Sequence, residues 1–196
     1  MNAVPDRSNF VSAWAPAKVN LYLHVGAPGP GGLHPVDSFV MFADNRVADR
    51  ISARTWPQLT LDVEGPNAKA LKNAPNNLTL AAAMALREAC DRRGLGAALT
   101  LHKELPIAGG VGGGSSDAAA TLHILNKVWG IEFGEQALER LATQLGSDVP
   151  ACVRNRPLVM RGTGERLYDV AAPSLPAVLV NPGVVLETRK VFERFD

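Results

Sequence analysis

The chain has 196 residues, of which 46% are hydrophobic and 20% charged, and its formal net charge at pH 7 is +1. These globular values exclude a disordered chain, and the small charge argues against nucleic acid or a membrane surface as the main partner. Its apolar runs are too short to span a membrane, the first ten residues lack the apolar region of a signal peptide, and Cys90 and Cys152 lack metal-ligand spacing. We therefore expect a cytoplasmic protein with reduced thiols.

The N-terminal part of the chain is predicted to form strands. Residues 12–25 alternate apolar and polar side chains, which indicates one or two strands that meet at Pro16. The segment 27–35 is too rich in glycine and proline for regular structure and is predicted to be a loop. Three more strands are predicted over residues 37–43, 49–54 and 58–64.

The remainder alternates helices and strands. A helix is predicted over 77–93, ended by Gly94, and a strand over 97–105 leads into the most glycine-rich part of the chain. Helices are predicted over 115–128 and 134–145, short strands over 158–160 and 177–180, and the start of a last helix over 187–195. No internal repeat is present, so the pattern predicts an α+β chain in two layers, with helices packed on sheet.

Residues 106–119 read PIAGGVGGGSSDAA and carry the strongest functional signal. Five of the six positions 109–114 are glycine, and the stretch lies between a predicted strand and a predicted helix. Glycine lets the backbone adopt positive φ and approach a ligand, and the unpaired N–H groups of a helix N-terminus attract anions. This arrangement predicts a phosphate-binding loop.

Two common phosphate motifs do not match this stretch. A Walker A loop ends in Gly-Lys-Ser or Gly-Lys-Thr, but no lysine lies between Lys103 and Lys127. The dinucleotide motif G-x-G-x-x-G fits from Gly110, but Glu132 is a poor match for the acidic residue expected about 20 positions later. The alternative is a serine-capped surface turn. The helical spacing of the apolar residues that follow argues against it.

Four segments together resemble the GHMP kinases. The glycine stretch is similar to the central phosphate motif of that family, P-x-x-x-G-x-G-G-G-S-S-D-A-A. Residues 15–24 (APAKVNLYLH), 146–150 (GSDVP) and 180–188 (VNPGVVLET) are similar to three other motifs, in the same order. The match is to the branch of the family that phosphorylates 4-diphosphocytidyl-2-C-methyl-D-erythritol, and it extends over nearly the whole chain.

The resemblance implies a fold and a domain division. It implies the N-terminal domain of a GHMP kinase, similar to domain 2 of ribosomal protein S5, with ATP binding and catalysis in residues 1–156. Residues 157–196 would begin a C-terminal subdomain that is largely missing, so we expect a fragment, a truncated product or a short member of the family.

The resemblance also implies a catalytic pair. Asp148 would be the general base, and Lys18 would lower its pKa and hold the acceptor hydroxyl. Without the resemblance, Asp148 is typical of a turn or a helix cap, and Lys18 is typical of a solvated lysine at a strand edge.

ATP is the implied phosphate donor, with Mg²⁺, and the loop would hold both. Ser115 is expected to contact phosphate or to cap the helix, and Ser116 to face phosphate, Mg²⁺ or its water. Asn77 and Lys103 are expected near the adenine or the phosphates, with helix capping an equal alternative for Asn77. No residue is assigned as a metal ligand, and two alternatives stay open: Mg²⁺ held by side chains, or Mg²⁺ held by the nucleotide alone. The loop residues assigned to the nucleotide are Pro106, Ile107, Ala108, Gly109, Gly110, Val111, Gly112, Gly113, Gly114, Ser115 and Ser116.

The acceptor site is implied by fewer residues. Asn20 lies two positions after Lys18, on the same face of a strand, and is expected to contact the acceptor. His34 matches the family histidine that contacts cytosine, although Leu33 stands where the family commonly has tyrosine. Thr188 is expected to touch the erythritol part, and Phe192 to stack on the base.

The sequence therefore predicts an ATP-dependent kinase that phosphorylates the 2-hydroxyl of 4-diphosphocytidyl-2-C-methyl-D-erythritol in isoprenoid precursor synthesis. Its partners are then small molecules, and a monomer or weak homodimer is expected. Two alternatives remain open: a GHMP kinase acting on mevalonate, homoserine or a sugar, and a nucleotide-binding protein without catalytic activity.

Overall fold

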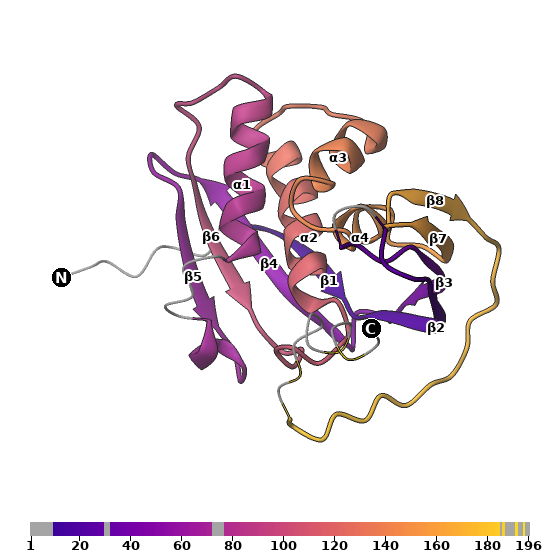
Figure 1. Cartoon of the computed structure of the whole chain (residues 1–196). Coiled ribbons are helices and arrows are strands. Elements are labelled where there is room, and N and C mark those ends of the chain that lie inside the picture. Colours follow the sequence, from indigo (N-terminus) through magenta and orange to yellow (C-terminus); the bar gives the residue numbers. More distant parts are fainter. Residues whose placement is uncertain are drawn as a thin grey trace.

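A computed structural model describes residues 10–29, 32–71, 77–184, 186, 191 and 194. It contains two four-stranded sheets with helices between them (Figure 1). The first sheet has the order β1 (Val11–Pro16), β4 (Ala48–Thr55), β6 (Ala97–His102), β5 (Thr60–Glu64). The second has the order β2 (Lys18–Val25), β3 (Val36–Phe42), β7 (Leu158–Gly162), β8 (Arg166–Asp169). All pairs are antiparallel except the parallel pair β5–β6.

Among the described residues, four α-helices occupy the space between the sheets, with a short 3-10 turn, η2 (Ala68–Ala70), after β5. Helix α2 packs on β1, β4, α1 and α4 and is the centre of the molecule. The helices are α1 (Leu78–Ala89), α2 (Gly113–Val128), α3 (Glu135–Ala142) and α4 (Val149–Arg154).

The main core lies between the first sheet and α1 and α2. Alternate residues of β6 are buried, Leu99 and Leu101 among them, because one face of the strand meets the helices. Leu122 and Leu125 of α2 and Leu86 of α1 are buried opposite. The second sheet has a smaller core of its own, formed by Val40, Ala151, Leu158 and Met160.

Most of the elements expected from the sequence are confirmed, with shifted ends. The strand pattern over residues 12–25 splits at Pro16, the last residue of β1. The first long helix ends at Ala89, not before Gly94, and Asp91 leaves the helical region with φ +52°. Helix α2 begins at Gly113 rather than at residue 115, so part of the glycine run belongs to the helix.

One expectation for the C-terminal part is wrong, one lies outside the described residues, and two elements, helix α4 and strand β8, were not expected. Residues 177–180 form no strand, and Val178 and Val180 are almost fully exposed, because no neighbouring strand pairs with them in the described part of the chain. The helix expected over 187–195 falls almost entirely outside the described residues.

The second sheet also bears on the expected domain division. Strand β7 pairs with β3, and β8 pairs with β7, so residues 158–169 complete a sheet begun before residue 43. A boundary after residue 156 would therefore separate strands of one sheet. The extended segment that runs around the molecule begins only after β8 (Figure 1).

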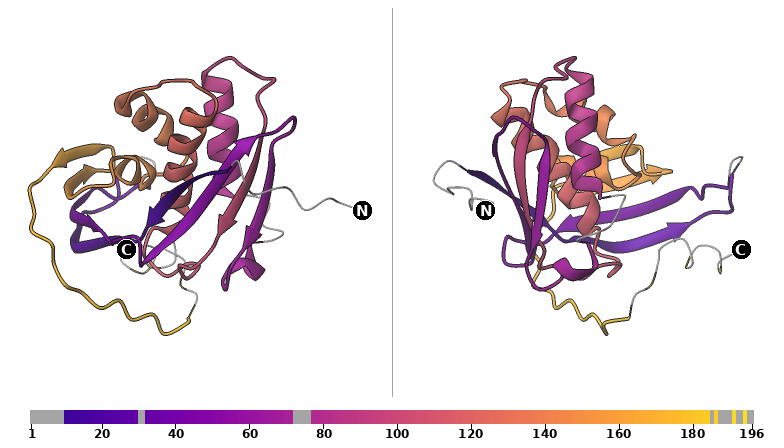
Figure 2. Two further views of the ribbon diagram at one scale, coloured as in Figure 1. Left: turned by 180° about the vertical axis from the view of Figure 1, so that it is seen from behind. Right: turned by 90° about the vertical axis from the view of Figure 1, so that its left-hand side faces the viewer.

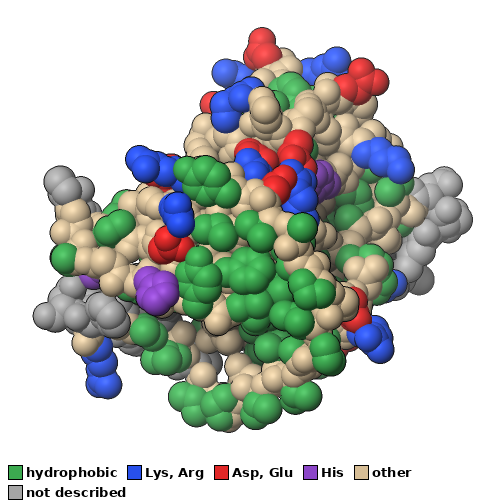
Figure 3. All heavy atoms as spheres, turned by 90° about the vertical axis from the view of Figure 1, so that its right-hand side faces the viewer, with side chains coloured by type: hydrophobic (Ala, Val, Ile, Leu, Met, Phe, Trp, Pro, Cys, Tyr) green, Lys and Arg blue, Asp and Glu red, His purple; other side chains and the backbone are tan. Residues whose placement is uncertain are grey.

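Strands β2 and β3 project from the body as a long hairpin (Figure 2). A register shift between Asn20 and Tyr22 interrupts their pairing near the base of the hairpin. On the side of the molecule where the second sheet lies, many hydrophobic side chains face solvent (Figure 3). The exposed ones on this sheet include Leu21, Leu23 and Tyr168.

Candidate active site

Lys18 begins β2 and is buried at the centre of the candidate site. Its Nζ donates a hydrogen bond to Asn20 Oδ1 at 3.0 Å and lies 3.4 Å from Asp148 Oδ1. Its backbone N–H donates to the carbonyl of Val111 at 2.8 Å, so the glycine loop is fastened to the same residue. The lysine is therefore not a solvated residue at a strand edge.

Asp148 stands at the N-cap position of α4. Its carboxylate makes no capping hydrogen bond, and Pro150 in the first turn of α4 removes one of the N–H groups that a cap would satisfy. The side chain is 36% exposed and pairs with Lys18. The carboxylate thus faces both a buried cation and solvent, where it can accept a proton from a bound molecule.

Asn20 links Lys18 to the buried hydroxyl of Ser38 on β3. Asn20 Nδ2 donates to Ser38 Oγ at 2.6 Å, and Ser38 Oγ donates to the carbonyl of Tyr22 at 2.7 Å. These hydrogen bonds orient the Asn20 amide so that its oxygen faces the lysine, and the lysine is held by groups on two strands.

The glycine loop lies beside Lys18 because Gly112 allows it to approach. Gly112 is the N-cap of α2, with φ +63°, and a Cβ there would come within 3.1 Å of the Lys18 Cβ. Gly110 also has a positive φ, +72°, with open space around it. By helix geometry the N–H groups of residues 113–115 have no partner within the helix, so they are available to an anion.

The two serines that follow the loop differ from expectation. Ser115 is the third residue of α2, so it does not cap the helix, because Gly112 does. Ser116 is buried, and its Oγ donates to the carbonyl of Pro16 at 2.7 Å, with the Cys152 sulfur 3.4 Å away. The Ser116 side chain therefore joins α2 to β1 and is directed away from the loop surface, which corrects its expected contact with phosphate or Mg²⁺.

Lys103 is also directed into the interior. Its Nζ donates to Asp49 Oδ2 at 2.5 Å and to Asp117 Oδ2 at 2.7 Å, and all three side chains are at most 4% exposed. Its ammonium group therefore pairs with two buried carboxylates. The expectation that Lys103 contacts adenine or phosphate is wrong.

A cavity of about 270 Å³ opens beside the first residues of the loop. Its lining includes Pro106 and Ile107 from the start of the loop, and Asn67 and Lys69 from the segment after β5. Asn67 is fixed by its Nδ2, which donates to the carbonyl of Glu104 at 2.8 Å. The remaining lining residues are Pro66, Ala70, Asn181, Gly183 and Val184. A lining that combines apolar side chains with an amide and a cation is suited to a heterocyclic base.

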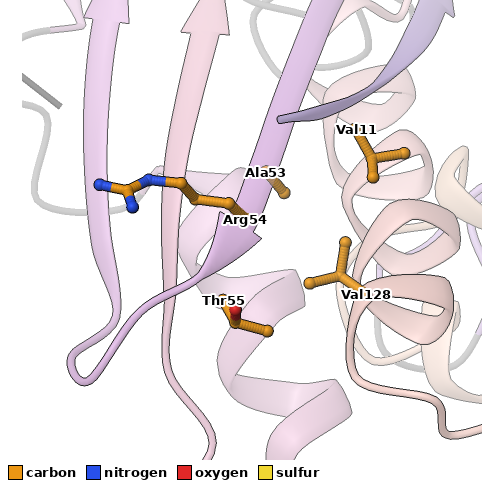
Figure 4. A pocket seen from close by; sticks show the side chains of 5 residues that line it. All are labelled: Val11, Ala53, Arg54, Thr55 and Val128. Carbon is orange, nitrogen blue, oxygen red and sulfur yellow. The ribbon is translucent and has the colours of Figure 1, made fainter. Parts of the chain in front are cut away.

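A second cavity, of about 260 Å³, lies elsewhere (Figure 4). It is lined by Val11, Ala53, Arg54, Thr55 and Val128, and the Arg54 guanidinium points away from it. Val128 ends α2 and Gly113 begins it, so this cavity is roughly 22 Å from the loop at 1.5 Å per helical residue. It is not part of the candidate site.

The remaining expected residues are scattered or undescribed. Asn77 caps α1, its Oδ1 accepting from the N–H of Thr79 at 2.9 Å, which is the capping alternative. His34 lies at the far end of the hairpin, where its Nδ1 lies 2.9 Å from the carbonyl of Gly26. Thr188 and Phe192 lie outside the described residues.

Sequence reasoning missed Ser38, Asp49 and Asp117. The last two are separated from Lys103 by many residues, and only strand pairing brings Asp49 beside it. Asp117 carried a local signal, because a charged residue within an otherwise apolar helix face requires a buried partner.

Comparison with known proteins agrees with the sequence motifs. Residues 77–156 match the family described as GHMP kinases N terminal domain. The 4-diphosphocytidyl-2-C-methyl-D-erythritol kinase of Hyphomonas neptunium is 48% identical over 187 residues, covering 95% of this chain and 62% of that protein. The enzyme of the same name from Granulibacter bethesdensis is 45% identical, covering 92% of this chain and 60% of that protein.

A solved structure gives the same picture for the fold. The crystal structure of 4-(cytidine 5'-diphospho)-2C-methyl-D-erythritol kinase superposes with a TM-score of 0.77 at 35% identity, covering 93% of this chain and 63% of that one. The chain thus spans about 62% of the length of the relatives it matches. In the part of the chain that is described, no helix has the length and apolar character needed to cross a membrane.

Proposed function

We propose that this chain, which belongs to the GHMP kinase family, catalyses the ATP-dependent phosphorylation of the 2-hydroxyl of 4-diphosphocytidyl-2-C-methyl-D-erythritol. The observation that carries the proposal is the buried Lys18 beside the half-exposed Asp148, with the glycine loop fastened to the same lysine. A base, a cation and a phosphate cradle are the three parts that phosphoryl transfer requires.

ATP would bind along the loop. Its base would occupy the cavity formed by Pro106, Ile107, Asn67 and Lys69, and its phosphates would lie on the N–H groups at the start of α2. The positive end of the helix dipole adds to these hydrogen bonds. The loop leads from the cavity to Lys18, so the terminal phosphate would lie near the catalytic pair.

Asp148 would accept the proton of the acceptor hydroxyl as its oxygen attacks the γ-phosphorus. The bond from that phosphorus to the bridging oxygen breaks, and ADP leaves with the electron pair. Lys18 would hold the hydroxyl against Asp148 and offset the negative charge between carboxylate and phosphate. Positioning and charge supply most of the barrier reduction, since the transition state is loose.

No side chain is assigned as a magnesium ligand. Within the described ranges, no group of three or more His, Cys, Asp or Glu residues is arranged for a metal. We propose that Mg²⁺ enters with the nucleotide, on phosphate oxygens and water, which are the ligands it prefers. The steps of the transfer are therefore assigned to residues of the chain alone.

The hairpin is suited to an elongated acceptor. From Lys18 to Val25 the strand extends roughly 23 Å at 3.3 Å per residue, and His34 lies beyond its end. Asn20 would contact the acceptor near the reacting hydroxyl, and His34 would contact its distant cytosine. The contacts expected for Thr188 and Phe192, the cytoplasmic location and the monomeric or weakly dimeric state stay predictions.

A substrate panel tests this function. ADP release would be measured with the cytidyl acceptor, mevalonate, homoserine and a hexose in turn. We expect release to depend on the cytidyl acceptor alone. ADP release with one of the other acceptors would show that the chain is a kinase with a different acceptor. ATP binding without ADP release for any acceptor would favour a nucleotide-binding protein.

A further inference from the structure

A buried cluster of three charged residues lies directly beneath the glycine loop. Lys103 pairs with Asp49 of β4 and with Asp117 of α2. A Cβ on Gly113, the first residue of α2, would lie 3.0 Å from Lys103 Nζ and 3.6 Å from Asp49 Oδ2. The cluster therefore lies directly beside the first residue of α2.

The cluster holds both ends of the loop. Asp49 Oδ1 accepts the N–H groups of Glu104 and Leu105 at 2.7 and 2.8 Å, which fixes the segment that leads into the loop. Asp117 belongs to the helix that leads out of it, and Lys103 joins the two carboxylates. Charge within the cluster is thus coupled to the position of the loop.

The charges do not balance when both carboxylates are ionised. One lysine and two carboxylates leave one negative charge, buried below the N–H groups that would bind phosphate. Asp117 Oδ1 is buried and has no hydrogen-bond partner among the described residues, whereas both oxygens of Asp49 are bonded. Asp117 is therefore the member that can carry a proton at least cost.

We propose that phosphate binding to the glycine loop is coupled to the uptake of one proton by the Asp49–Asp117 carboxylate pair, so that the cluster becomes neutral beneath the bound anion. The proton is bound mainly by Asp117. Its pKa is a property of both carboxylates together, because they share one lysine. The inference rests on the proposed function only in taking ATP as the ligand.

The surroundings of Asp117 support this reading. Burial raises the pKa of Asp117 to about 7; the Lys103 charge opposes the rise and the Asp49 charge adds to it. From α4 the nearby titratable group is the Cys152 thiol, whose pKa burial raises to about 12, so it stays neutral. The buried residues of α1, which also packs on α2, carry no charge. The charges of Asp148, Lys18 and Asp117 all act on the Cys152 thiol, so the catalytic pair and the cluster both lie near it.

Calorimetry tests the proposal without a turnover assay. Mg·ATP would be titrated at pH 7.5 into the whole chain, into Asp117→Asn and into Asp62→Asn, each in two buffers of different ionisation enthalpy. Asp62 is an exposed β5 residue, so its variant controls for the substitution itself. With a pKa of about 7, about a quarter of Asp117 is already protonated at pH 7.5. We therefore expect the wild type and Asp62→Asn to take up about three-quarters of a proton more than Asp117→Asn on binding.

Equal proton numbers in the wild type and Asp117→Asn, with ATP bound by both, would overturn the inference and leave the proposed function intact. If the wild type binds no ATP, both are overturned. Should Asp117→Asn fail to fold, Asp49→Asn replaces it: its amide oxygen still accepts the two backbone N–H groups, and the uptake is expected to vanish there too.

Discussion

Lys18 Nζ lies 3.4 Å from Asp148 Oδ1, although one residue begins a strand of the second sheet and the other precedes α4. The lysine is buried and the carboxylate is partly exposed, so the pair has one side toward the protein and one toward a ligand. The pair itself and the residues that hold it in place each lead to a prediction.

Replacing Lys18 by methionine removes the cation of the pair while keeping most of the side-chain volume. We expect kcat to fall by about 10²-fold or more, because Asp148 loses the charge that holds the hydroxyl against it. Steady-state ADP release measures this. Lys127→Met, at an exposed position of α2, is the control and should leave kcat unchanged. An equal kcat in Lys18→Met and the wild type would remove Lys18 from the mechanism.

Gly112→Ala and Gly110→Ala form a matched pair. Both residues have positive φ, so each alanine costs about 1 kcal/mol in backbone strain. Only the Gly112 methyl group would press on Lys18, at 3.1 Å, since nothing lies within 4 Å at Gly110. We expect similar losses in unfolding free energy but a much larger loss of kcat/KM in Gly112→Ala. Equal kcat/KM values would show that the Lys18 contact does not matter.

Ser38→Ala removes the buried hydroxyl that orients Asn20. The Asn20 amide and the Tyr22 carbonyl each lose a partner, so we expect the free energy of unfolding to fall by about 1–3 kcal/mol. Ser52→Ala, which breaks an exposed hydrogen bond with Ser12 in the other sheet, should change it by less than about 0.5 kcal/mol. Urea denaturation measures both. A loss of unfolding free energy in Ser38→Ala as small as that in Ser52→Ala would contradict the role of the Ser38 hydroxyl in orienting Asn20.

Asp117 should make stability depend on pH. Its folded pKa, about 7, exceeds the ordinary value of 3.8, so the folded state binds more protons between these values. The stability that comes from protonated Asp117 is complete below about pH 4 and is lost as the pH rises through about 7. We expect the unfolding free energy of Asp117→Asn, relative to that of the wild type, to increase as the pH rises to about 7. Above that pH the difference between the two proteins should stay constant. Parallel curves between pH 5 and 8 would contradict this assignment.

The elements with a strong local pattern could be predicted from the sequence. The strands before residue 64 alternate, and the glycine run followed by alanines predicted both the loop and α2. Helix α4 was missed although Pro150 marks a helix start, because six residues give little periodicity. The strand expected at 177–180 required a partner strand, and alternation of side chains does not supply one.

The catalytic role that we propose for Lys18 and Asp148 could be inferred only from the resemblance to a family, because each residue has a commoner structural role. The cluster beneath the loop could not be predicted as a whole, because only Asp117 carried a local signal. Lys103 was expected to face the nucleotide, but the register of β4 against β6 sets Asp49 beside it, and a buried lysine pairs with a buried carboxylate. Tertiary position, and not residue type, decided its role.

The most direct test is ADP release by the wild type and by Asp148→Asn, each with ATP and 4-diphosphocytidyl-2-C-methyl-D-erythritol. The account predicts release that depends on the acceptor in the wild type, and a kcat lower by about 10²–10⁴-fold in the variant with ATP affinity retained. Equal release by the two proteins would contradict the assignment of Asp148 as the base.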